Sequence, residues 1–135
     1  LKVVLPWGNE EEEQRAQRIA KTAKPDDVWV PEQSLSLNVV AQLLHFAKGV
    51  VSVDTGLSHV SAALEVPMVV LYRVTDPKLV GADGSKVKRL QSPCAPLYLK
   101  KFNSAEQAQR SLKGLSVDEV FQALVHQSEL DANFI

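Results

Sequence analysis

Residues 50–64 read VVSVDTGLSHVSAAL, a β-branched run that stops at an acid before a Thr-Gly pair and a stretch of small residues. The pattern predicts a buried strand over Val50–Val53, a tight turn, and a helix over about 57–64. In open α/β sheets, ligands bind at the carboxyl ends of the strands, which is where Asp54 and Thr55 would lie. The first amides of a helix lack intrahelical partners, and the helix dipole favours anions. The turn is therefore a candidate anion-binding site.

Three further apolar runs predict strands, at Val3–Leu5, Val28–Val30 and Met68–Tyr72. None alternates cleanly, as expected for strands that are covered on both faces. Helical patterns separate the strands, over Glu10–Ala23 and from Ser36, which can cap its helix, to Ala47. Alternating strands and helices predict an α/β fold with a doubly wound parallel sheet.

Beyond Tyr72 the pattern is looser. Thr75-Asp76-Pro77 begins a predicted turn, residues 82–85 predict another, and residues 87–90 allow one more strand. Two capping boxes, starting at Ser104 and Ser116, predict C-terminal helices over about 104–127. At 135 residues, the chain is expected to form one domain.

Composition excludes several classes of protein. A net charge of −1 gives no electrostatic basis for binding nucleic acid. Cys94 is the only cysteine, so an internal disulfide is impossible and zinc-type ligand clusters are absent. No apolar run approaches the roughly 20 residues of a membrane-spanning helix. Because the chain starts inside a predicted strand and lacks an initial Met, we expect a piece of a longer protein.

Each candidate residue also has a plain structural interpretation. Asp54 would serve equally well as a helix N-cap, and His59, one helical turn further on, is more often structural in such a position. Thr75 and Asp76 most simply start a turn, although they follow a strand at the same sheet edge. The acidic run at residues 10–13 suits the first turn of a helix, yet it follows a strand end, where a carboxylate can accept hydrogen bonds from a ribose.

The central segment resembles the D-[TS]-G-x-x-H-x-A-A motif of glycosyltransferase family 9, the lipopolysaccharide heptosyltransferases, in particular the heptosyltransferase I branch. Two flanking segments agree with that family in order and spacing. Leu5-Pro6-Trp7-Gly8 precedes a Glu-rich helix, and Tyr72-x-x-Thr75-Asp76-Pro77 is similar to a YGPTDP turn. Arg73-Val74 stands where that turn has Gly-Pro. The resemblance covers about residues 2–81.

The resemblance implies the C-terminal, Rossmann-like half of a GT-B glycosyltransferase, which binds the donor ADP-L-glycero-D-manno-heptose. The implied reaction is an inverting heptose transfer to a Kdo sugar on lipid A, without a metal or other cofactor. It implies a cytoplasmic enzyme, with peripheral association at the inner membrane. By position, Asp54 contacts the heptose, while Thr55, Gly56 and Leu57 hold the diphosphate beside His59. Two further residues carry over by position: Glu12 to the ribose and Leu35 to the adenine.

The same resemblance places the general base, the acceptor site and a phosphate-binding lysine in an N-terminal domain upstream of this chain. The isolated chain is therefore expected to lack transferase activity and to bind ADP weakly or not at all. Two other functions remain open. One is a flavodoxin-like or receiver-type binding module, although the first strand ends in Pro6-Trp7-Gly8 rather than in paired acids. The other is a GT-B donor domain for a different nucleotide sugar.

Overall fold

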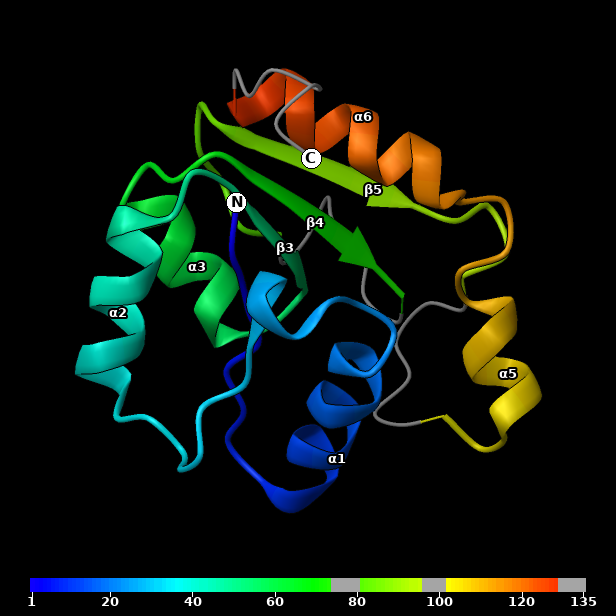
Figure 1. Ribbon diagram of the computed structural model, residues 1–135. Helices are drawn as coiled ribbons and strands as arrows, with labels where there is room; N and C mark the ends of the chain where they lie inside the picture. Colours follow the sequence, from blue (N-terminus) through cyan, green and yellow to red (C-terminus); the bar gives the residue numbers. More distant parts are fainter. Residues whose placement is uncertain (74–80, 96–101, 129–135) are drawn as a thin grey trace. The chain divides into compact units, whose positions relative to one another are not determined.

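The computed structural model describes residues 1–73, 81–95 and 102–128 (Figure 1). Its elements are, in order, β1 (Val3–Val4), α1 (Glu10–Ala20), the 3₁₀ turn η1 (Pro25–Asp27), β2 (Val28–Trp29), α2 (Leu37–Phe46), β3 (Val50–Val53), α3 (Gly56–Ala63), β4 (Met68–Tyr72), β5 (Val87–Gln91), α5 (Ala105–Arg110) and α6 (Val117–Ser128). The chain divides into two compact units, one over Leu1–Leu43 and one from Leu44 onward. Each unit is described by itself.

The first unit is built on a short parallel pair of strands. Val3 lies opposite Val28 and Val4 opposite Trp29, so both strands are shorter than predicted. The helix α1 ends at Ala20 rather than at Ala23. At its end the chain makes 3₁₀-type hydrogen bonds, in which the Thr22 and Ala23 N–H groups donate to the carbonyls three residues earlier. The α-helix stops here because Pro25 follows closely and a helix rarely continues up to a proline.

The second unit contains a parallel sheet in the order β3-β4-β5. The strands Val50–Val53 and Met68–Tyr72 match the prediction, and the additional strand is confirmed at Val87–Gln91. The turn predicted over residues 82–85 lies two residues later, at 84–87, where the Val87 N–H donates to the Gly84 carbonyl. The predicted turn at Thr75-Asp76-Pro77 lies outside the described residues.

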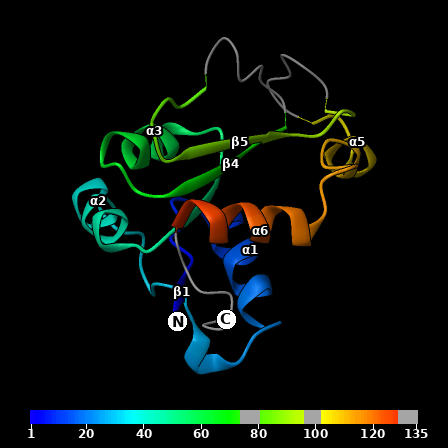
Figure 2. The ribbon, with the colours of Figure 1, turned by 90° about the horizontal axis from the view of Figure 1, so that it is seen from above.

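Helices cover both faces of this sheet. Met68, Val70 and Tyr72 of β4 pack with Ala62 of α3 and with Ala82. Successive side chains of a strand point to opposite faces, so the remaining β4 residues face the other side, where α6 contacts β4 and β5. Figure 2 shows α3 and α6 on either side of the strands. This arrangement confirms the predicted α/β class with parallel strands.

Candidate functional site

Asp54 directly follows β3 and lies beside His59 of α3. The Nε2 atom of His59 is 3.9 Å from Oδ1 of Asp54, and the two atoms attract strongly only when the imidazole is protonated. The Asp54 side chain is 13% exposed, whereas that of His59 is 54% exposed. The predicted proximity of the two side chains is confirmed. The Asp54 carboxylate is largely buried at the end of β3, whereas the His59 ring is exposed to solvent.

The helix N-cap of α3 is Thr55, so the alternative that Asp54 caps the helix is wrong. Thr55 has the extended backbone of a cap residue, with φ −143° and ψ 170°. Ser58 holds this turn: its buried hydroxyl donates to the Thr55 carbonyl at 2.6 Å and accepts from the Thr55 N–H at 3.4 Å. Sequence analysis missed Ser58, because the usual capping box has Glu or Gln three residues after the cap, and here a serine takes that position.

The turn presents backbone amides to solvent at the positive end of α3. In the described part of the chain, the N–H groups of Gly56 and Leu57 have no acceptor. Thr55 and Gly56 are exposed, and a Cβ added at Gly56 would meet no atom within 4 Å. Among the described residues these two amides are therefore available to a ligand, and the anion site at this turn stays a prediction.

Tyr72 and Arg89 belong to the same strand-end region, and sequence analysis missed both. The fully buried Tyr72 hydroxyl accepts from the Ala82 N–H at 3.1 Å, and Nε of Arg89 donates to the Ala82 carbonyl at 3.0 Å. Burial raises the pKa of Tyr72 and the Asp54 charge raises it further, against the lowering effects of the Ala82 N–H and Arg89. No local pattern marks these residues, because the register of β4 against β5, with Val70 opposite Arg89, brings them together.

Replacing Tyr72 with phenylalanine is expected to cost about 1–3 kcal/mol of unfolding free energy, because the buried Ala82 N–H loses its acceptor. The raised pKa makes this hydroxyl ionise more readily in the unfolded chain, so the native protein loses stability as the pH rises above about 10. The variant lacks that loss. In denaturant titrations, the unfolding free energies of the native protein and of Tyr72→Phe should therefore differ by a constant amount below about pH 10 and by less above it. A difference that grows with pH would contradict the assignment.

In the first unit, Glu12 already has a structural task. Its Oε2 accepts from the Gly8 N–H at 2.7 Å, while its own N–H donates to the Asn9 side chain that caps α1. The residue is exposed. Glu12 therefore orders the turn after β1, and its carboxylate faces solvent as a ribose ligand requires.

Leu35 lies half-buried in the loop between β2 and α2. Trp7 braces this loop, since its Nε1 donates to the Pro31 carbonyl at 2.8 Å and its own carbonyl accepts from the Ser34 hydroxyl at 3.2 Å. Glu12 and Leu35 thus belong to the first unit and residues 54–59 to the second. Thr75 and Asp76 lie outside the described residues.

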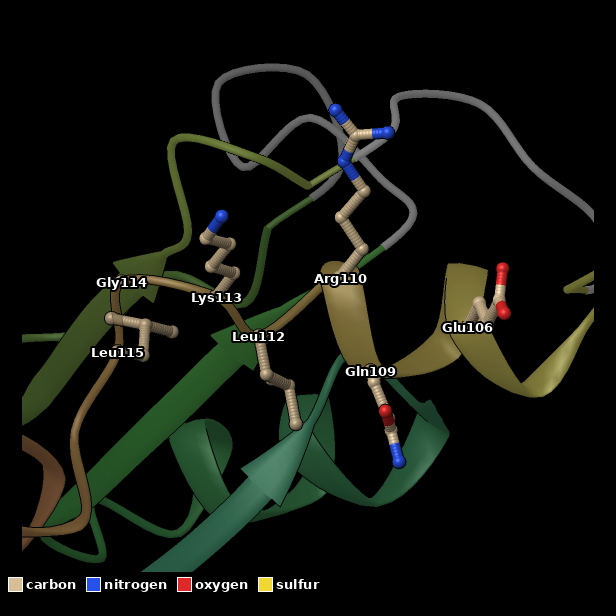
Figure 3. Close-up of a pocket in the computed structure, with 7 residues that line it drawn as sticks. All are labelled: Glu106, Gln109, Arg110, Leu112, Lys113, Gly114 and Leu115. Atoms are coloured by element: carbon tan, nitrogen blue, oxygen red, sulfur yellow. The ribbon is translucent and has the colours of Figure 1, made fainter.

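A hollow of about 530 Å³ runs along α5 and the turn after it (Figure 3). Arg110 and Lys113 point to one side of this segment, and Gln109 and Leu112 point to the other. None of the predicted site residues lines the hollow. Across residues 1–73, 81–95 and 102–128, no three His, Cys, Asp or Glu side chains are grouped to hold a metal ion. No helix within these ranges is long and apolar enough to cross a membrane.

Sequence comparison finds relatives of this chain. The chain is 48% identical over 96 residues to lipopolysaccharide heptosyltransferase 1 of Salmonella typhimurium, a match that covers 71% of this chain and 28% of that protein. It is 45% identical over 100 residues to the Pseudomonas aeruginosa protein of the same name, covering 73% and 27%. The chain thus spans about a quarter to a third of the length of these relatives.

Comparison with solved structures gives the same result. The fold matches E. coli heptosyltransferase WaaC with ADP, with a TM-score of 0.75 and 35% identity, over 94% of this chain and 34% of that one. It also matches E. coli ADP-heptose lps heptosyltransferase II at 20% identity and a TM-score of 0.75, which supports the GT-B fold alone. The sequence model of glycosyltransferase family 9 (heptosyltransferase) matches residues 1–109. The chain therefore belongs to glycosyltransferase family 9.

Proposed function

We propose that this chain is the donor-binding part of a lipopolysaccharide heptosyltransferase that transfers heptose from ADP-L-glycero-D-manno-heptose to the Kdo of the inner core. The proposal depends mainly on the turn from Asp54 to Leu57. In this turn a largely buried carboxylate lies next to the backbone amides at the N-terminus of α3. Two matched structures support the choice of nucleotide: one is WaaC with ADP, the other WaaC with ADP-2-deoxy-2-fluoro heptose.

The turn has the two functions that a nucleotide-sugar donor needs. Amides of Gly56 and Leu57 donate to the diphosphate, where the positive end of α3 favours negative charge. The Asp54 carboxylate accepts charge-assisted hydrogen bonds from the sugar hydroxyls, and His59 stands beside the phosphates. In the first unit, Glu12 accepts from the ribose and Leu35 packs on the adenine. The proposal also includes Thr75 and Asp76, which lie outside the described residues, as loop contacts to the donor.

In the proposed reaction, a base in an N-terminal domain takes the proton from the acceptor hydroxyl. The acceptor oxygen bonds to C1 of the heptose on the face opposite the diphosphate, and the bond from C1 to the phosphate oxygen breaks. The bonding electrons leave with ADP, so negative charge grows on the phosphate. The α3 amides are aimed at that charge and stabilise the transition state more than the ground state. We further propose that the reaction uses no metal or other cofactor, and that the enzyme works in the cytoplasm with peripheral association at the inner membrane.

The alternatives lose support. Family membership favours a transferase over a flavodoxin-like or receiver-type binding module. A donor domain for another nucleotide sugar differs from the proposal only in the base pocket near Leu35.

The test is a transfer assay on the intact enzyme, supplied with ADP-heptose, a UDP-sugar or a GDP-sugar and a Kdo-lipid A acceptor. The proposal predicts turnover with ADP-heptose alone, and inhibition by free ADP that UDP and GDP do not match. Equal use of a UDP- or GDP-sugar would contradict the assignment of the nucleotide. The isolated chain, which lacks the proposed base, should show no turnover in the same assay.

A further inference from the structure

The first unit has two loops that leave the same edge of its strand pair. The strands β1 and β2 are parallel neighbours. The loop after β1, residues 5–9, leads to Glu12, and the loop after β2, residues 30–36, contains Leu35. Because the carboxyl ends of parallel strands meet at one edge, both loops start there, and with them the two proposed contacts to the nucleoside.

Trp7 joins these two loops by hydrogen bonds on both of its sides. Its indole Nε1 donates to the carbonyl of the fully buried Pro31 at 2.8 Å, and its own carbonyl accepts from the Ser34 hydroxyl at 3.2 Å. Within residues 1–43, all of which the structure describes, no other hydrogen bond connects the two loops. Beyond the strand pairing, Trp7 therefore supplies the polar contacts that fix the loop carrying Leu35.

The next residue along the chain orients Glu12. The Gly8 N–H donates to Oε2 of Glu12 at 2.7 Å, and a Cβ at Gly8 would lie 3.3 Å from that oxygen. The Asn9 side chain accepts from the Glu12 N–H at 2.9 Å. Among the described residues none donates a hydrogen bond to the second carboxylate oxygen, Oε1. The turn thus fixes one oxygen of Glu12 and leaves the other for a ribose hydroxyl.

These contacts connect Glu12 to Leu35 by a continuous path. From Glu12 the path runs through a hydrogen bond to Gly8 and along the backbone to Trp7. It continues through the Ser34 hydroxyl to Leu35, the next residue in the chain. A shift of Trp7 therefore moves both proposed contacts at once, and small displacements are enough to weaken directional binding.

We propose that Trp7 is a positioning residue that sets the spacing between the ribose contact and the adenine contact, and thereby the selectivity for the nucleoside of the donor. The inference rests on the proposed function, which assigns Glu12 to the ribose and Leu35 to the adenine. Tryptophan suits this task because its rigid ring carries one N–H donor at a fixed distance from the backbone. In a nucleoside the base is bonded directly to the ribose, so its two contacts must be correctly spaced.

The test compares nucleotides as inhibitors of heptose transfer by the intact enzyme. The 2′-deoxy and 3′-deoxy analogues of ADP each lack one ribose hydroxyl and report on Glu12, whereas GDP reports on the base contact. Trp7→Phe keeps most of the ring and removes the N–H donor. Its preference for ADP over GDP, and over the deoxy analogue that the native enzyme rejects more strongly, should each fall about three- to tenfold, the usual effect of one hydrogen bond.

Selectivity separates positioning from stability. A destabilised variant with a smaller folded fraction loses kcat, but its preferences among nucleotides stay native. Trp29→Phe is the matched control, because it removes the indole of β2, whose N–H makes no hydrogen bond in the described residues, and it should keep both preferences. If Trp7 acts through Glu12, adding Trp7→Phe to Glu12→Ala should change the preference over the deoxy analogue far less than in the native enzyme.

Ser34→Ala is a milder second variant, which decides the matter if thermal melts show that Trp7→Phe does not fold. It removes the other hydrogen bond between the loops and should lower the preference for ADP over GDP in the same direction. Native preferences in the folded variants, or a native enzyme that does not distinguish ADP from either deoxy analogue, would overturn the inference.

The proposed function fails in a different measurement, when the native enzyme does not use ADP-heptose or uses a UDP-sugar equally well. Amide exchange in the 135-residue chain then tests the linkage without a ligand. Trp7→Phe should speed exchange of the Gly8 N–H at least about threefold, and Trp29→Phe should not, because only Trp7 fixes the turn in which that N–H is bonded. Equal Gly8 exchange in the two variants would overturn the linkage.

Discussion

Replacing Gly56 with proline is expected to slow heptose transfer by the intact enzyme about 100- to 1,000-fold, the usual effect of removing one donor from a transition-state anion site. Proline deletes the Gly56 N–H and little else. Gly56 is the first residue of α3, a position where proline is favoured, and Thr55 before it already has the extended backbone that proline requires. Steady-state transfer rates, measured beside thermal melts, check the prediction.

Gly56→Ala is the matched control. It keeps the N–H and adds one methyl group to open space, so the chain should be as stable as the native one, or up to about 1 kcal/mol more stable. Its transfer rate should lie between those of the native and proline variants, because the methyl group crowds the diphosphate. A proline variant with native kcat/KM would show that the α3 amides take no part in transfer.

Asp54→Asn is expected to lower kcat/KM for ADP-heptose about 10- to 100-fold, since hydrogen bonds to a charged group contribute about 1.5–3 kcal/mol. The amide keeps the shape of the carboxylate and loses its charge, so the fold should stay near native. Kinetics with ADP-heptose at fixed acceptor concentration measure the loss.

The same variant carries an internal check. The Asp54 charge contributes to raising the pKa of Tyr72, so Asp54→Asn should lower that pKa and weaken the loss of stability at alkaline pH. Asp83→Asn is the control acid: it lies in the same unit, is 96% exposed, and pairs with Arg89 at 3.1 Å. If Asp83→Asn reduced kcat/KM as much as Asp54→Asn, the effect would reflect general charge rather than sugar binding.

The sequence predicts well whatever depends on local pattern. The strands Val50–Val53 and Met68–Tyr72 were predicted at their observed bounds, because β-branched runs bounded by polar turns leave little ambiguity. The caps at Ser36 and Ser104 accept the expected amide hydrogen bonds. The proximity of Asp54 and His59 could also be predicted, because Asp54 directly precedes the cap of the helix that carries His59.

What the sequence does not predict depends on contacts between distant segments. The Tyr72 hydroxyl accepts a hydrogen bond from the Ala82 N–H, and Arg73 donates one to the Ser111 hydroxyl, 38 positions away in the sequence. No periodicity marks such partners, since strand register and helix docking decide them. The assignment of Asp54 as a cap failed for a local reason: Thr55 and Ser58 together form the better capping pair.

The proposed function assigns residues 54–59, Glu12 and Leu35 as contacts of the ADP part of a heptose donor. The most direct measurement is an NMR titration of the 135-residue chain with ADP and, in parallel, UDP, up to millimolar concentration. We expect amide shifts at Glu12, Leu35 and residues 54–59 with ADP and not with UDP. Equal shifts with both nucleotides, or ADP-induced shifts confined to other residues, would contradict it.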